Sequence, residues 1–148
     1  GGGAHLEPEM ADYIASRDDY DFASLEMGIN MRGEFTVEQF RERVDYFVST
    51  VANAHPDQWL FCLDMFPEYT SIWTSDEQQA KADTFRQIVR DKVAAIDRPR
   101  VVHIEAQPLL PDHTQLAADV LHPSPQGMES IGRNLAAALQ SHLDGDVT

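Results

Sequence analysis

Apolar residues at helical spacing divide most of the chain into four amphipathic stretches. Between Thr36 and Ala54 they recur every three or four positions, and Gln39 stands three residues after Thr36, which is the pattern of a capping box. The same pattern opens the next stretch at Ser75. The predicted helices, with their caps, are Leu6–Ala15, Thr36–Ala54, Ser75–Ile96 and Ser124–Leu143, with Met10, Tyr13 and Ile14 inward in the first and Met128, Ile131, Leu135 and Leu139 inward in the last.

Three short runs rich in β-branched and aromatic residues lie between these helices. The run Trp59–Met65 is apolar nearly throughout, as expected of a parallel strand that is covered on both faces. The runs Phe22–Met27 and Val101–Glu105 are bounded by turn residues and read as the other two strands. The segment Gly28–Gly33 is predicted to be a loop, and the single cysteine, Cys62, is predicted to be buried and unreactive.

Strands and helices therefore alternate along the chain. Such alternation predicts an α/β fold, in which parallel strands are joined by right-handed helical crossovers and helices cover both faces of the sheet. Three strands make a small sheet for this much helix, and no strand precedes the first helix. We therefore expect a single, partial domain over residues 1–148 that lacks the first one or two strands of its sheet.

Composition narrows the class of partner. The chain has 148 residues, of which 43% are hydrophobic, which is enough for a folded core. Its net charge of −14 disfavours nucleic acid and anionic membrane surfaces, because both are negative as well. No apolar run approaches the ~20 residues of a membrane span. No signal peptide is visible, which slightly favours the cytoplasm, but a chain that starts at Gly1 without a methionine need not include its leader.

The strongest chemical signal is the stretch Asp119-Val120-Leu121-His122-Pro123. A histidine that acts as a general base needs an acceptor on its second ring nitrogen, because that acceptor selects the tautomer. Asp119 lies three residues before His122 in a tight loop and is suited to this role. The alternative is an ordinary turn ahead of the last helix, which Ser124 caps with a proline in the first turn.

This stretch and two others resemble blocks of the SGNH, or GDSL-type, hydrolase family. Gly28-Ile29-Asn30, directly after a strand, is similar to the family's G-x-N block, and Asp119 to Pro123 is similar to its D-x-x-H block. The glycine-rich opening before Leu6 is similar to the second block, with Gly2 as the hallmark glycine. The resemblance implies a flavodoxin-like α/β fold and cofactor-free hydrolysis of carboxylic esters by a Ser-His-Asp triad.

The resemblance also implies a role for each matching residue. His122 would take the proton of a serine and return it to the leaving alcohol, while Asp119 would orient the imidazole. Asn30 and Gly2 would help to stabilise the oxyanion. The family's G-D-S block, which carries the nucleophile, has no counterpart in this sequence. We therefore expect the serine to lie upstream of Gly1 and the chain on its own to be inactive.

Polar and aromatic residues near the strand ends allow further interpretations. Glu26, Asp64 and Glu105 could bind Mg²⁺, as in a receiver-like domain, or pair with backbone N–H groups, Arg32 or a shared proton. A transition-metal site from His103, Glu105 and Asp112-His113 is a weaker alternative, and we assign no metal to either group. Aromatic residues after the second strand are candidates for an acyl pocket or for packing of the loop on the sheet: Phe66, Tyr69 and Trp73.

Two classes of function follow. The first is an ester hydrolase that acts on a small-molecule or carbohydrate ester. The second is an acidic binding module, which would self-associate as a homodimer through an open edge of its sheet.

Overall fold

The computed structural model describes residues 3–68 and 74–146. Its contacts divide the chain into two compact units. The first, which we call the sheet unit, comprises Gly1–Met65 and Ala80–Ile104. The second, the loop–helix unit, comprises Phe66–Gln79 and Glu105–Thr148.

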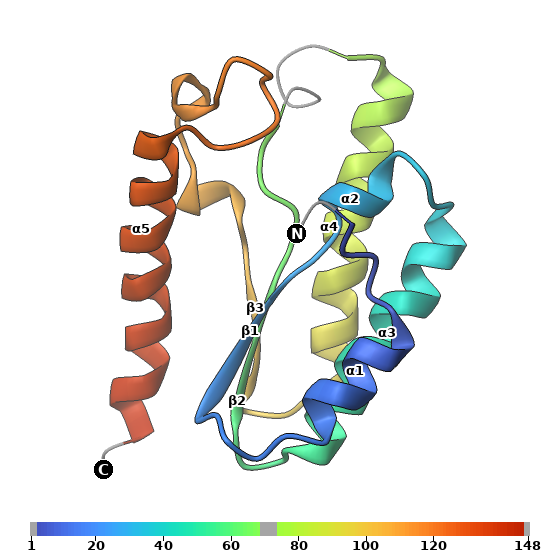
Figure 1. Ribbon diagram of the computed structural model, residues 1–148, viewed down its shortest axis with the longest axis vertical. Helices are drawn as coiled ribbons and strands as arrows, with labels where there is room; N and C mark the ends of the chain where they lie inside the picture. Colours follow the sequence, from blue (N-terminus) through green and yellow to red (C-terminus); the bar gives the residue numbers. More distant parts are fainter. Residues whose placement is uncertain (1–2, 69–73, 147–148) are drawn as a thin grey trace. The chain divides into compact units, whose positions relative to one another are not determined.

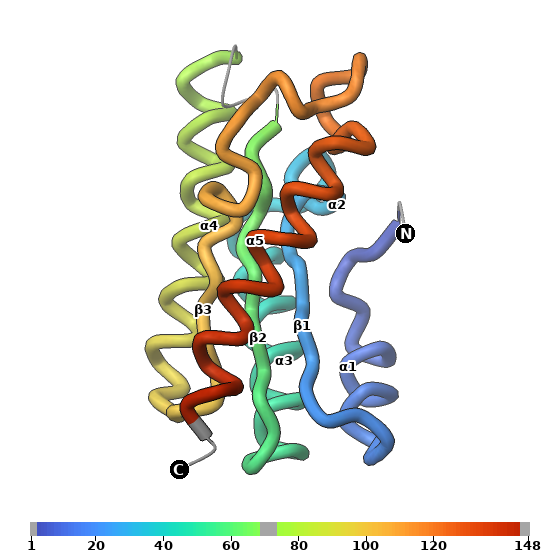
Figure 2. Tube along the Cα trace, turned by 90° about the vertical axis from the view of Figure 1, so that its left-hand side faces the viewer, coloured from blue at the N-terminus to red at the C-terminus, as the bar shows by residue number. Residues whose placement is uncertain are grey.

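The sheet unit is built on three parallel strands, as the sequence predicts. They are β1 (Phe22–Glu26), β2 (Trp59–Leu63) and β3 (Val101–Ile104), and they run side by side in the order β1-β2-β3 (Figure 2). The predicted strands extend one or two residues further at their carboxyl ends, a difference common at element boundaries. β2 is the central strand, paired on both edges, and its side chains are buried along nearly its whole length.

Three helices pack on the same side of this sheet (Figure 1): α1 (Pro8–Ala15), α3 (Val37–Ala54) and, from Ala80 on, α4 (Asp76–Ile96). The rings of Phe40 from α3 and Phe85 from α4 stack with 4.0 Å between their centroids. Both rings are fully buried, as is Cys62 of β2. The predicted burial of Cys62 is confirmed, and it raises the pKa of the thiol to about 12, as expected of an unreactive thiol.

Side-chain capping marks the start of α3 and, in part, of α4. The predicted box at α3 is formed, since Gln39 N donates to Thr36 Oγ1 at 3.2 Å and Thr36 N donates to Gln39 Oε1 at 2.8 Å. At α4 the box is only half formed. Gln78 N lies 3.4 Å from Ser75 Oγ, but Gln78 Oε1 accepts from the Thr74 hydroxyl instead of returning to Ser75.

The predicted loop Gly28–Gly33 is wrong, because it contains the short helix α2 (Ile29–Arg32). Gly28 has φ +129°, a conformation that favours glycine, and its carbonyl accepts from Met31 N and Arg32 N at 3.0 Å each. Met31 is buried in the core, so tertiary packing stabilises a turn that is too short to show helical periodicity.

The loop–helix unit contains the 3₁₀ turns η2 (Gln107–Leu109) and η3 (His113–Gln115), the helix α5 (Pro125–Leu143) and the terminal turn η4 (Asp144–Asp146). The predicted cap of α5 is confirmed, since Ser124 Oγ accepts from Gly127 N at 3.1 Å and Pro125 lies in the first turn.

Two predicted inward faces differ from the structure. On α1, Met10 is 50% and Tyr13 is 52% exposed, and the buried residue is Ala11. A small side chain at that position lets α1 approach α3, which moves the contact face by one residue. On α5, Met128 is 59% exposed, whereas Ile131, Leu135 and Leu139 are half-buried as expected.

Candidate active site

The Asp119–His122 segment forms the tip of a small hairpin within the loop–helix unit. Leu116 and Pro123 form an antiparallel bridge, and Ser124 N donates to Gln115 O at 2.8 Å. At the tip, Ala117 N donates to His122 O at 2.7 Å. The hairpin leads directly into α5 (Figure 2), so the first turn of that helix anchors one of its arms.

The two side chains of the predicted pair meet at the tip. His122 Nδ1 lies 2.7 Å from Asp119 Oδ2, and the other carboxylate oxygen, Oδ1, accepts from the backbone N–H groups of Leu121 and His122 at 3.0 Å each. Asp119 is an acceptor, so Nδ1 carries the proton and Nε2 is left as the basic nitrogen. The structure therefore brings Asp119 and His122 together as the sequence predicts.

These hydrogen bonds also fix the charge of Asp119. They lower the pKa of its carboxyl to about 2, chiefly through the His122 side chain and then through the N–H groups of His122 and Leu121. The carboxylate is therefore ionised at neutral pH. An ionised partner stabilises the imidazolium that forms when His122 accepts a proton.

The other ring nitrogen of His122 faces solvent. The His122 side chain is 72% exposed, and no hydrogen bond among the described residues reaches Nε2. Four serine hydroxyls in the described ranges are engaged elsewhere: Ser75 and Ser124 cap helices, and Ser16 and Ser141 donate to helix carbonyls. The pair can thus accept a proton from a nucleophile, and none of the hydrogen bonds found in the described ranges joins a serine hydroxyl to His122.

The remaining predicted site residues are placed in part. Asn30 is half-buried in the first turn of α2, within the sheet unit. Phe66 is half-buried at the start of the loop–helix unit. Gly2, Tyr69 and Trp73 lie outside the described residues, so the oxyanion role of Gly2 and the acyl-pocket role of the two aromatics stay predictions.

A second aspartate–histidine pair lies in the sheet unit. His103 Nε2 on β3 is 2.8 Å from Oδ2 of Asp64, which follows β2. Cys62 is the register partner of His103, and Asp64 lies two residues further along on the same face. On sequence alone His103 is grouped with Glu105, and Asp64 with Glu26 and Glu105, so sequence reasoning misses this pair. An aspartate that follows an apolar strand, beside a histidine on the next strand, was the available signal.

Glu26 at the end of β1 is the third titratable group in this region. It retains solvent contact, yet desolvation by the surrounding protein, followed by the negative charge of Asp64, raises its pKa to about 7. No group of three His, Cys, Asp or Glu side chains in the described ranges is arranged to hold a metal ion. The magnesium and transition-metal alternatives therefore gain no support.

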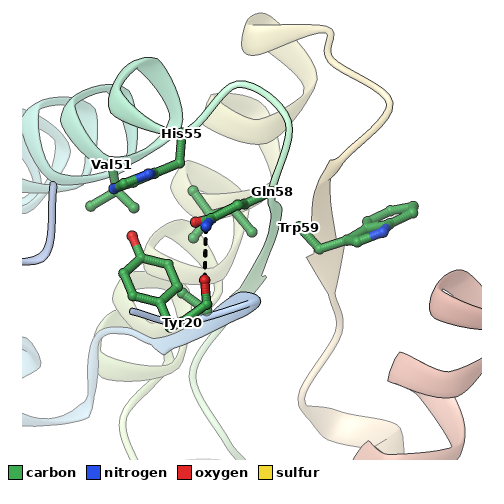
Figure 3. Close-up of a pocket in the computed structure, with 7 residues that line it drawn as sticks. Tyr20, Val51, His55, Gln58 and Trp59 are labelled. Atoms are coloured by element: carbon green, nitrogen blue, oxygen red, sulfur yellow. Dashed lines mark hydrogen bonds between the residues drawn. The ribbon is translucent and has the colours of Figure 1, made fainter. Parts of the chain in front are cut away.

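A pocket at the opposite end of the strands is too small for an ester substrate (Figure 3). It lies where β1 and β2 begin, between Tyr20, His55 and Gln58, and has a volume of about 10 Å³. Gln58 Nε2 donates to Tyr20 O at 2.7 Å across its wall. This space admits one water-sized sphere.

Among the helices that the structure describes, we find none with both the length and the apolar character of a membrane span.

Comparison with known proteins supports the fold. No family model and no curated protein matches the sequence. Among solved structures, the chain resembles a GDSL-like lipase from Bacteroides ovatus (TM-score 0.79, 17% identity), of which it covers 42% with 97% of its own length. It also resembles the salicylyl-acyltransferase SsfX3 from a tetracycline biosynthetic pathway (TM-score 0.75, 17% identity), with 91% of this chain and 42% of that chain covered.

A third similar structure is a carbohydrate esterase of family 3 from Talaromyces cellulolyticus (TM-score 0.69, 18% identity). Here the match covers 99% of this chain and 70% of the other. The chain thus spans less than half the length of the first two proteins. Its parallel sheet flanked by helices is the α/β fold of SGNH-type hydrolases over part of their length.

Proposed function

We propose that the chain is part of an SGNH-type carboxylic ester hydrolase, in which Asp119 and His122 act with a serine from outside this sequence. The observation that carries the proposal is the geometry of the pair. His122 Nδ1 is bound to an ionised carboxylate at 2.7 Å, and the opposite face of the ring is open to solvent. The likeness to two proteins named as a lipase and a carbohydrate esterase supports the reaction class.

In this proposal His122 Nε2 removes the proton from the serine hydroxyl as the oxygen attacks the ester carbonyl. Asp119 keeps Nδ1 protonated and stabilises the positive imidazolium. His122 then gives the proton to the departing alcohol, and in the second half of the reaction it activates water in the same way. Asn30 and Gly2 are proposed to donate to the oxyanion, where one such donor is worth ~3 kcal/mol of barrier.

The test is performed on the chain together with its natural upstream segment. His122→Ala should lower kcat for a short acyl ester such as p-nitrophenyl acetate by at least about a thousand-fold and leave KM nearly unchanged. The reason is that His122 transfers the serine proton in the transition state and does not bind the ester. A variant that retains a tenth of the wild-type kcat would refute the role of His122.

A matched control is His142→Ala in the last turn of α5. This histidine is about 26 Å from the start of the helix at 1.5 Å per residue, so kcat should be unaffected. The 148-residue chain on its own should show no hydrolysis above background. Turnover by that chain at the rate of the longer protein would place the nucleophile within this sequence and overturn that part of the proposal.

A further inference from the structure

Val120 has an unusual backbone for its residue type. Its φ is +56°, in the left-handed region that glycine and asparagine enter readily. Of the three non-glycine residues with positive φ in the described ranges, Leu6, Asp97 and Val120, it is the β-branched one. A β-branched side chain in this region is a conformational outlier, and such strain persists only where the surrounding structure enforces it.

The left-handed residue lies between the two members of the Asp119–His122 pair. Val120 N donates to Ala117 O at 2.9 Å and closes a turn, after which the chain reverses. The reversal turns the N–H groups of Leu121 and His122 toward Asp119 Oδ1 and sets the imidazole against Oδ2. All three hydrogen bonds of the Asp119 carboxylate therefore depend on the backbone of Val120.

The arms of the hairpin and the start of α5 enforce this turn. Ser124 N is bonded to Gln115 O at 2.8 Å, and Leu116 bridges Pro123. Gly127, one turn into α5, approaches so closely that a Cβ added there would overlap Gln115 O and come within 3.2 Å of Pro123 Cβ. With its arms fixed this tightly, the tip has few other ways to close.

We propose that Val120 is a positioning residue, and that the Asp119–His122 pair forms only while its backbone is left-handed. The residue touches no substrate in this proposal and acts through the carboxylate and the imidazole. The inference deepens the proposed function, but its first test concerns the pair itself and needs no esterase activity.

The test compares substitutions that tolerate or forbid the left-handed backbone. Val120→Asn should raise Tm by about 2–4 °C, because asparagine adopts this conformation at little cost. It should also keep the Asp119 pKa near 2, followed by carboxyl ¹³C NMR, and keep a downfield His122 Nδ1–H resonance. Val120→Pro, whose φ is fixed near −65°, should bring the Asp119 pKa back toward its ordinary 3.8 and abolish that resonance.

Val120→Ile is the matched control, since it keeps both the β-branch and the strain and should behave as wild type. The proposal fails if a folded Val120→Pro protein retains the low Asp119 pKa and the Nδ1–H resonance. It fails equally if Val120→Asn gives no rise in Tm, because Val120 would then not be strained in solution. The second variant keeps the test decisive if Val120→Pro does not fold.

In the longer protein, Val120→Pro should lower kcat about a hundred-fold with little change in KM, whereas Val120→Asn should keep kcat near the wild-type value. An unchanged kcat together with a disrupted pair would contradict the proposed function and leave the positioning role of Val120 intact. An intact pair in Val120→Pro would contradict the positioning role and leave the proposed function intact.

Discussion

Two aspartate–histidine pairs of nearly equal length lie in contrasting surroundings. In the sheet unit, Asp64 and His103 are 2.8 Å apart, with side chains 0% and 16% exposed. In the loop–helix unit, Asp119 and His122 are 2.7 Å apart, with side chains 51% and 72% exposed. The first pair uses His103 Nε2 and links neighbouring strands, whereas the second uses His122 Nδ1 and leaves Nε2 in solvent.

The contrast shows that a short distance does not by itself identify a catalytic pair. A buried carboxylate or imidazole that loses its partner is costly, so removing one member of the buried Asp64–His103 pair, the inner pair, should destabilise the sheet. An exposed ion pair contributes little to stability because water competes for both groups. Its value lies in presenting a basic nitrogen whose tautomer is already selected.

The largest expected effect comes from the inner pair. Asp64→Ala should lower the free energy of unfolding by about 3 kcal/mol, because it leaves a buried polar partner unsatisfied and opens a cavity. Asp119→Ala should lower it by less than about 1 kcal/mol. Urea unfolding of both variants measures the two values. A larger loss for Asp119→Ala would reverse the assignment of the pairs.

A smaller effect should concern the exposed Asp119–His122 pair, the outer pair. Gly127→Ala forces the first turn of α5 away from Gln115 and Pro123, and it should cost about 1–3 kcal/mol and raise the Asp119 pKa. Gly132→Ala on the same helix meets nothing within 4 Å and should stabilise by about 0.5–1 kcal/mol. Thermal unfolding and carboxyl NMR distinguish the variants. Equal effects would mean that the close approach at Gly127 is absent in solution.

The smallest effect is a pH dependence near the inner pair. The Glu26 pKa is raised from 4.5 to about 7, so the folded state binds a proton that the unfolded state releases. Its contribution to stability is therefore complete below about pH 4.5 and is lost as the pH rises through 7. Because Glu26 is partly solvated, we expect a loss on the order of 1 kcal/mol. Glu26→Gln should flatten the stability profile between these pH values, and an unchanged slope would show that another group titrates there.

Local signals predicted the parts of this molecule whose causes are local. The Thr36–Gln39 box, the Ser124 cap and the apolar run of β2 each specify their element within a few residues, and the structure confirms them. The Asp119–His122 contact also spans only three residues, so sequence spacing sufficed to predict it.

What the sequence could not reveal depends on contacts between distant residues or on strain. Asp64 and His103 are 39 positions apart and meet only because β2 and β3 pair in one register. The α2 turn depends on burial of Met31. Nothing in the identity of Val120 indicates a left-handed backbone, since valine is among the residues least suited to it.

The buried thiol of the central strand makes the sheet easy to monitor. Cys62 is the one cysteine in the sequence, and its 0% exposure and its pKa of about 12 leave almost no thiolate at neutral pH. A maleimide or disulfide reagent can react with it only in molecules whose central strand has transiently opened. The labelling rate thus reports how often the sheet opens. It needs no engineered probe and can be measured for each variant above.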